Sequence, residues 1–388
     1  MEESVKRVRC ASGATFSKYD TSCAKGLAIL LMLMHHCFLS PNRYKGQVVD
    51  FSPFSESEIN AIALSFKICV AIFVFISGYG IACSMMKMKK AGHYSPANIT
   101  VSVAKRLVSL IGGYLFVFAI AQLWSLIVVR DGRWLKVYGG GALGIVHFAV
   151  DALGLGELLG MPLFLATFWY MSLAILIVLL VPILFDVANR YGYPLVFGLA
   201  LLLRVFFRPT SDATFAYLPD YLGCVVMGMW AAEGELISKF DLIQICSSRQ
   251  LSGTLKLIAT ATAGLACMFL RQITRTTALL PFWDSIIALI VCCVMHSWID
   301  RIPIINTILS RIGKHSMNVF LTHNFVRIMW YYDFTYSFGK WWLIILVLLL
   351  VSMAVSICIE FLKKILGYDR LLLHLRNCCD SLGVGLTS

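Results

Sequence analysis

Long apolar runs divide this sequence and leave few options for its fold. A run of about 17 to 25 mostly apolar residues can cross a bilayer as a helix, and a helix satisfies its own backbone polar groups without water. We recognise ten such runs, of which the fifth, sixth and ninth are short or interrupted: 24–40, 61–83, 107–129, 164–185, 193–207, 217–232, 255–271, 279–298, 316–332 and 341–362. The composition, with 59% hydrophobic and 14% charged residues, excludes an ordinary soluble domain. We therefore predict an all-α, polytopic integral membrane protein with about ten transmembrane helices.

Lysine and arginine are unevenly divided between alternate loops of this arrangement. The net charge of +12 would suit a nucleic-acid partner, but in a polytopic protein the cytoplasmic loops carry the basic excess. Most loop lysines and arginines fall on one side if the N-terminus is cytoplasmic. We therefore predict two cytoplasmic termini, contact with membrane lipids and no nucleic-acid partner. The predicted parts are a tail (1–21), a membrane domain (22–362) and an amphipathic tail on the inner membrane surface (363–388).

Cysteine indicates no metal site and no disulfide framework. The thirteen cysteines include no Cys-x-x-Cys pair. Most of them lie in apolar runs, where cysteine acts as a small hydrophobe.

The first apolar run contains a cation and two histidines, and ionisable groups inside a membrane span are costly enough to suggest function. Lys25 and His36 are eleven residues apart, which places them within about 20° of one helix face and roughly 16 Å apart. His35 is rotated away by one residue, and it stays a further catalytic candidate beside His36. The spacing therefore predicts that Lys25 and His36 look into one space.

Two further apolar runs contain ionisable or small polar residues. The second includes Lys67, expected to be a buried cation, and ends in Ser77-Gly78-Tyr79-Gly80, where the glycines allow close helix packing. The ninth contains His323 well inside the run. Asp220 and Asp284, at the beginnings of other runs, are read as ordinary polar caps.

Two connecting segments have unusual composition. The loop after the second run is the most basic, and it is either a solvated cytoplasmic loop or the rim of a site for a nucleotide-like anion. The glycine-rich segment from Arg130 to Met161 is interrupted, and we expect it to roof the bundle. His147 and Asp151 within it are spaced so that they could pair.

Four segments, in this order, resemble the signatures of acyltransferase family 3. The members of this family are integral-membrane O-acyltransferases. They are Lys25 to His36, Phe73 to Gly80, Phe168-Trp169-Tyr170-Met171 and Gly313 to His323. The family commonly has an arginine where this chain has Lys25, and a second arginine where it has Ser109. The resemblance implies transfer of an acyl group, usually acetyl, from cytoplasmic acyl-CoA to a hydroxyl of a surface polysaccharide or lipid-linked glycan in a bacterial cell membrane.

The resemblance and the chemistry together suggest roles for particular residues. Transfer to a hydroxyl needs a base near neutral pH, and histidine meets that need. His36 is the expected base, with a hydrogen-bonded structural imidazole as its alternative. His323 is a second acid/base group, an oxyanion donor or a structural histidine. The remaining expected site residues are Lys25, Lys105 and Arg106 for the coenzyme phosphates, and Trp169, Tyr170, Lys67, Ser77 and Tyr79 for substrate.

Two other functions fit a polytopic chain with buried polar groups. A transporter or flippase would use Lys67, His36 and His323 to line a path, and inverted repeats, of which we find no convincing sign, would favour it. A glycan polymerase usually has a long external loop with arginines, for which the glycine-rich segment is a modest candidate. The sequence does not specify the acceptor, the acyl group or the oligomeric state.

Overall fold

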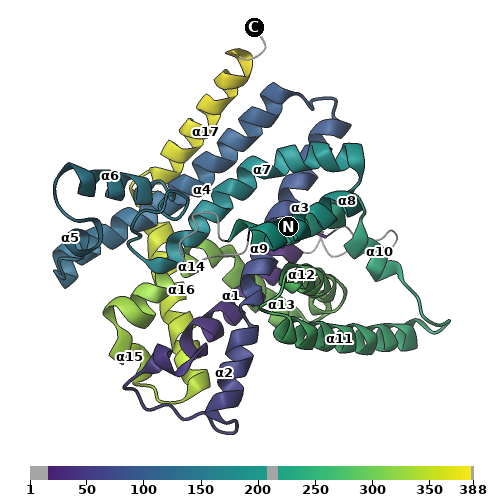
Figure 1. The fold of residues 1–388 in the computed structure, drawn as a ribbon, viewed down its shortest axis with the longest axis horizontal. Coiled ribbons are helices and arrows are strands. Elements are labelled where there is room, and N and C mark those ends of the chain that lie inside the picture. The colour runs from purple at the N-terminus through teal and green to yellow at the C-terminus, as the bar shows by residue number, and fades with distance from the viewer. Residues whose placement is uncertain (1–15, 208–216, 386–388) are drawn as a thin grey trace.

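Helices supply the regular structure of this chain in a computed structural model that describes residues 16–207 and 217–385 (Figure 1). The bounds in the first half are α1 Lys18–Phe38, α2 Glu56–Ser65, α3 Ile68–Lys90, α4 Pro96–Trp124, α5 Arg133–Tyr138, α6 Gly141–Ala152, α7 Trp169–Tyr191 and α8 Tyr193–Phe206. Those in the second half are α9 Leu218–Glu233, α10 Leu236–Leu242, α11 Arg249–Ile273, α12 Leu280–Ser297, α13 Pro303–Lys314, α14 Ser316–Asn324, α15 Tyr332–Tyr336, α16 Trp341–Ile365 and α17 Tyr368–Gly385. π-Helical turns, Ser125–Val129 and Phe325–Trp330, extend α4 and α14. The predicted all-α class is confirmed.

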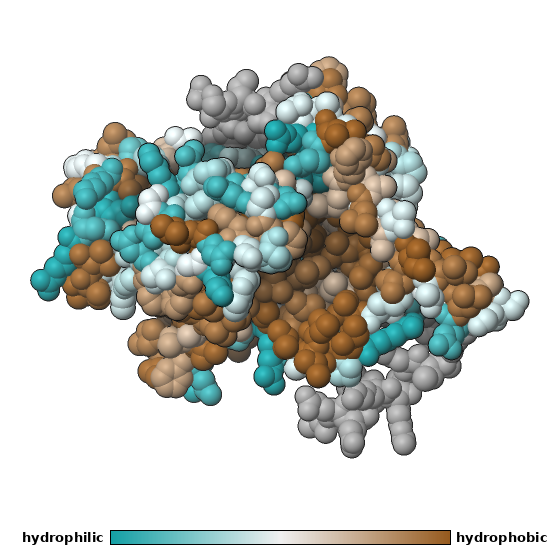
Figure 2. Space-filling view, turned by 90° about the horizontal axis from the view of Figure 1, so that it is seen from below, coloured by the Kyte–Doolittle hydropathy of each residue, from teal (hydrophilic) through white to brown (hydrophobic). Residues whose placement is uncertain are grey.

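Seven helical segments of the described chain are long and apolar enough to cross a membrane: Lys18–Phe38, Glu56–Lys90, Pro96–Val129, Ala166–Tyr191, Gln250–Ile273, Leu280–Ser297 and Trp341–Ile365. They coincide with seven of the predicted spans. The other three predicted spans correspond to α8, α9 and the extended α14, which are shorter. Broad hydrophobic surface on the face drawn in Figure 2 fits lipid-facing helices. The chain is a polytopic membrane protein, and the count of ten stays a prediction.

The second predicted span consists of two helices with a break between them. α2 ends at Ser65 and α3 begins at Ile68. Lys67 lies in the break, and its side chain is exposed. The prediction that Lys67 is a buried cation is therefore wrong, because the interruption turns its side chain out of the packed helices.

The amphipathic helix α13 was not predicted, and it positions the helix that follows. Its backbone touches that of α1, since a Cβ at Gly26 would lie 2.0 Å from the Leu309 carbonyl oxygen, and one at Gly313 would lie 1.7 Å from that of Ser22. Only glycine permits such an approach. α14 begins two residues after α13 ends, and it too contacts α1.

The glycine-rich segment after α4 folds as α5 and α6 around one carboxylate. Asp151 is fully buried and accepts hydrogen bonds from Tyr138 Oη at 2.7 Å, Tyr114 Oη at 3.2 Å and the Phe164 backbone N–H at 2.6 Å. His147 Nδ1 instead lies 3.1 Å from the carbonyl of Tyr138, so His147 and Asp151 bond to different groups. The carboxylate joins α6 to α4, to α5 and to the chain before α7.

The C-terminal helix α17 lies alongside α4 (Figure 1). An ion pair between Lys105 Nζ and Asp380 Oδ1, at 2.5 Å, joins the two helices. The amphipathic tail predicted from residue 363 is therefore partly covered by protein. The limits of the predicted tails stay predictions, and residues 1–15 and 386–388 lie outside the described part of the chain.

Orientation in the membrane is tested by cysteine labelling in a cysteine-free background. We expect a cysteine at Lys89, or near Ser388 at the end of the chain, to react with an impermeant probe only after the cytoplasmic face is opened, because the basic loops should be inside. Arg130 provides the matched external position. Strong labelling at Lys89 in intact cells would reverse the proposed orientation.

Candidate functional site

Two histidines from distant parts of the chain meet inside the helix bundle. His36 lies in the last turn of α1 and His323 in the last turn of α14. Their ring centroids are 5.0 Å apart, with the planes tilted by 40°. His323 is completely buried, whereas His36 is partly exposed. The pair thus has one fully enclosed member and one member that is partly exposed.

The hydrogen bonds of His323 determine which of its nitrogens carries the proton. Its Nδ1 lies 2.8 Å from the Phe320 carbonyl oxygen and 3.1 Å from that of Val319. Because a carbonyl only accepts, neutral His323 carries its hydrogen on Nδ1 and has a lone pair on Nε2. That Nε2 and the Nδ1 of His36 are both buried without a hydrogen-bond partner among the described residues.

The separation of the two rings suits a direct bond between these two nitrogens. An N–H···N bond of about 3 Å places the centroids of two imidazoles roughly 5 Å apart. A bond in which His36 Nδ1 donates to His323 Nε2 would fit this centroid separation of 5.0 Å. Neutral His36 would then have its lone pair on Nε2, which is the form that a general base needs.

A buried arginine that the sequence reasoning missed lies beside this pair. Arg327, on the π-helical turn after α14, is 1% exposed, and its Nε donates to Asn324 Oδ1 at 2.7 Å. Its guanidinium also lies by the hydroxyl of Tyr336, which donates to the backbone carbonyl of Cys37 at 3.1 Å. Its position four residues after His323 in an apolar run was the signal available in the sequence.

The loop after α1 brings a second arginine toward the same place. Arg43 interacts electrostatically with His36. Burial and the like charge of Arg327 lower the pKa of Arg43. The surroundings of the two histidines are therefore electropositive.

His35 has a different environment from His36. It is buried, and its Nδ1 lies 2.8 Å from the carbonyl oxygen of Ala63 in α2. This bond holds α2 against α1. The geometry suits a structural role, and the prediction that His35 is catalytic stays untested.

Tyr170 connects the predicted substrate residues to the histidine pair through aromatic contacts. Its ring meets Phe320 edge-on at 5.2 Å, and Phe320 lies 6.4 Å from the ring of His323. Ser77 is within hydrogen-bonding reach of Tyr170 and donates to the carbonyl of Phe73 at 2.9 Å.

Trp169 contacts the ring of Tyr170 edge-on, with centroids 5.8 Å apart, whereas Tyr79 makes its aromatic contact elsewhere. Trp169 stacks on Tyr217 with centroids 4.2 Å apart, and the edge of Tyr79 contacts Phe16 at 5.2 Å. Through Tyr170, Trp169 therefore joins the aromatic series that leads to His323. No aromatic contact described for Tyr79 does so, and the roles of both residues stay predictions.

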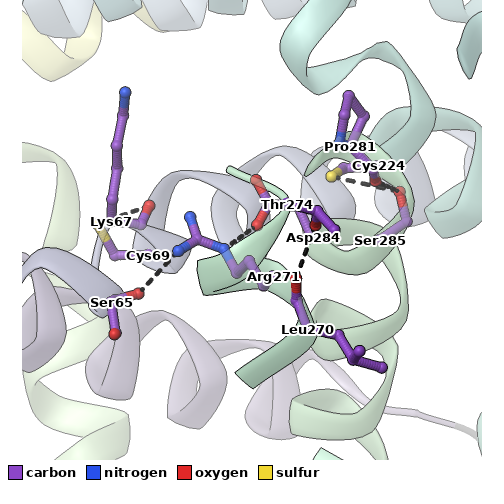
Figure 3. Close-up of polar contacts among 10 residues, drawn as sticks. All are labelled: Ser65, Lys67, Cys69, Cys224, Leu270, Arg271, Thr274, Pro281, Asp284 and Ser285. Carbon is purple, nitrogen blue, oxygen red and sulfur yellow. Dashed lines mark hydrogen bonds and ion pairs between the residues drawn. The ribbon is translucent and has the colours of Figure 1, made fainter. Parts of the chain in front are cut away.

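Lys67 stands beside a buried ion pair (Figure 3). Arg271 Nε is bonded to Asp284 Oδ1, with both side chains about 95% buried, and its Nη1 is 3.4 Å from the carbonyl of Ser65. Asp220 likewise pairs with Arg204. The two aspartates are partners of buried arginines and not simple caps, whereas the Lys67 side chain points away from the Arg271–Asp284 pair.

The predicted donor residues lie on two helices, Lys25 on α1 and the adjacent Lys105 and Arg106 on α4. Lys25 is in α1 and half-buried, while Lys105 pairs with Asp380. Arg106 donates from Nη2 to Ser84 Oγ at 2.6 Å. None of these bonds links Lys25 to the other two, so a shared phosphate site stays a prediction.

Comparison with known proteins identifies a family for this chain. Residues 19–361 match the model of a family described as an acyltransferase domain. The match runs from the start of α1 into the last turns of α16 and includes both histidines and Arg327. No curated protein and no solved structure matches the chain.

Proposed function

This chain belongs to acyltransferase family 3, and we propose that it is a membrane O-acyltransferase that moves an acetyl group from cytoplasmic acetyl-CoA to a hydroxyl of a cell-surface glycan or its lipid-linked precursor. The observation that supports this most strongly is the contact of His36 with His323. We place the protein in a bacterial cell membrane.

The chemistry assigns a distinct role to each histidine. His323, held by the Phe320 carbonyl, orients His36 by accepting from its Nδ1. His36 Nε2 then takes the proton of the acceptor hydroxyl while the oxygen attacks the thioester carbon. When the carbon–sulfur bond breaks, the same proton passes to the leaving thiolate. One neutral base thus serves both halves of the reaction.

The direct test has two parts. Purified protein in lipid should consume radiolabelled acetyl-CoA when an envelope glycan extract is added. Mass spectrometry of surface glycans from deletion and complemented strains should show an acetyl mass only in the complemented strain. Unchanged glycans together with deletion-dependent loss of glycan export would instead indicate a transporter.

Neutralising the proposed phosphate contacts should weaken donor binding more than catalysis. Lys25→Gln, Lys105→Gln and Arg106→Gln are each expected to raise the KM for acetyl-CoA roughly two- to fivefold, because exposed ion pairs contribute up to about 1 kcal/mol. The kcat should change little, since contacts distant from the reacting carbon stabilise ground state and transition state alike. Added salt should weaken donor binding less in these variants.

The ion pair of Lys105 with Asp380 sharpens this prediction. Asp380→Asn frees the ammonium and should lower the donor KM, and Ser109→Arg should also lower it by adding a cation one helical turn away. Asp369→Asn removes an exposed carboxylate from the same helix, α17, and serves as the control. A donor KM that responds to none of these changes removes this region from the donor site.

A further inference from the structure

The nitrogen atoms of the Arg327 side chain differ in whether they have a hydrogen-bond acceptor. Its Nε is bonded to Asn324, whereas its Nη1 is buried and has no hydrogen-bond partner among the described residues. Leaving a buried charged donor unpaired is costly. The hydrogen bonding of the Arg327 guanidinium is therefore complete only when a further acceptor binds Nη1.

No carboxylate in the described ranges forms an ion pair with this guanidinium. The other buried arginines, Arg204 and Arg271, each have an aspartate partner. Arg327 is buried more deeply than either, at 1% exposure. A buried cation without an anion is expensive unless a ligand supplies the negative charge.

Two contacts fix the guanidinium beside the reacting base. Asn324, adjacent to His323 in the sequence, holds the Nε end. Tyr336, which lies by the guanidinium, is bonded to the carbonyl of Cys37, the residue after His36. The chain segments of both histidines thus determine where the unpaired nitrogen lies.

We infer that Arg327 Nη1 donates to the thioester carbonyl oxygen and stabilises the negative charge that this oxygen acquires in the transition state. This inference rests on the function proposed above. It makes Arg327 a catalytic residue, because its guanidinium would contact the reacting carbonyl group. As the acceptor oxygen bonds to the carbon, its proton moves to His36 and the carbonyl electrons move to the oxygen beside Arg327. The carbonyl reforms when the thiolate leaves, and the thiolate takes the proton from His36.

Hydrolysis of the donor separates this role from acceptor binding. With water as acceptor, an oxyanion donor is still required, but an acceptor-binding residue is not. We expect Arg327→Gln to lower kcat for acetyl-CoA hydrolysis and for glycan acetylation by the same factor, roughly 10²–10³, as loss of one such donor typically does. The KM for acetyl-CoA should stay within about twofold.

Controls distinguish this chemistry from a folding defect. All rates are measured on protein that remains monodisperse, and Arg327→Lys, which retains the charge, should retain more activity than Arg327→Gln. Millimolar guanidinium should partly restore Arg327→Ala, because it supplies the missing donor without repairing the fold. The double variant Arg204→Gln/Asp220→Asn removes a buried guanidinium elsewhere and should keep its rate within about twofold.

The possible outcomes separate this inference from the proposed function. Unchanged hydrolysis with a raised acceptor KM in Arg327→Gln would assign Arg327 to acceptor binding and overturn the inference. Failure of guanidinium to rescue Arg327→Ala, with Arg327→Lys as inactive as Arg327→Gln, would also count against it. If the parent protein turned over no acetyl-CoA at all, the proposed function itself would fail.

Discussion

Replacing His36 with alanine is expected to lower acyl transfer by about 10²–10⁴-fold, the usual contribution of a general acid–base group. His36 is the partly exposed member of the histidine pair, whereas His323 and His35 are buried. His36 is therefore the imidazole at this place that is most accessible to an acceptor hydroxyl. Acetylated product is measured by mass spectrometry. Expression and membrane insertion, followed by fluorescence-detected chromatography, should stay at the parent level.

Two variants control for the effect of His36. His35→Ala removes the neighbouring imidazole and its bond to the Ala63 carbonyl, and it should lower activity far less. His323→Ala should lower activity, and adding it to His36→Ala should cost little more, because residues that act as one unit are not additive. Full acetylation by the His36 variant would exclude it as the base and favour the transporter hypothesis.

The candidate site could be predicted only in part. The cost of burying charge and the spacing of Lys25 and His36 drew attention to α1, and His323 was noticed for the same reason. Their contact joins residues 287 positions apart, which no local pattern specifies. Arg327 was overlooked because it follows His323 near the expected end of a span, where a cation can reach the interface. Its burial depends on Asn324 and Tyr336, which pack around it in the folded chain.

The predicted fold agrees with the structure where hydropathy alone determines the helices. It differs from the structure where contacts between distant parts of the chain determine them. Long apolar runs gave the seven membrane-length helices. The break at Lys67 divides a run that hydropathy alone reads as continuous. α13 contains polar residues such as Asn306, whose backbone and side-chain carbonyl oxygens accept from the Cys23 thiol of α1. Hydropathy alone does not reveal this contact between α13 and α1.

The glycines of Ser77-Gly78-Tyr79-Gly80 show how far a motif specifies packing. In α3, a Cβ at Gly78 would lie 2.4 Å from the Val225 carbonyl oxygen of α9, whereas a Cβ at Gly80 would meet nothing within 4 Å. Gly228 of α9 repeats the contact from the other side, because its Cβ would lie 2.2 Å from the Phe75 carbonyl oxygen. The sequence predicted close packing for both motif glycines, and the structure assigns it to Gly78.

Alanine at Gly78 is therefore expected to lose about 1–3 kcal/mol of stability or more, because the added methyl group meets backbone that cannot rotate away. Gly80→Ala should be neutral or stabilising by up to about 1 kcal/mol, since alanine favours the helix and has free space there. Apparent melting temperatures in detergent measure both, with Gly228→Ala expected to resemble Gly78→Ala. The two substitutions add the same methyl group two residues apart, so a difference in helix propensity cannot produce opposite results. If Gly78→Ala melted at the same temperature as Gly80→Ala, α3 and α9 would not touch at this level, and the packing that aligns Ser77 with Tyr170 would have to be redrawn.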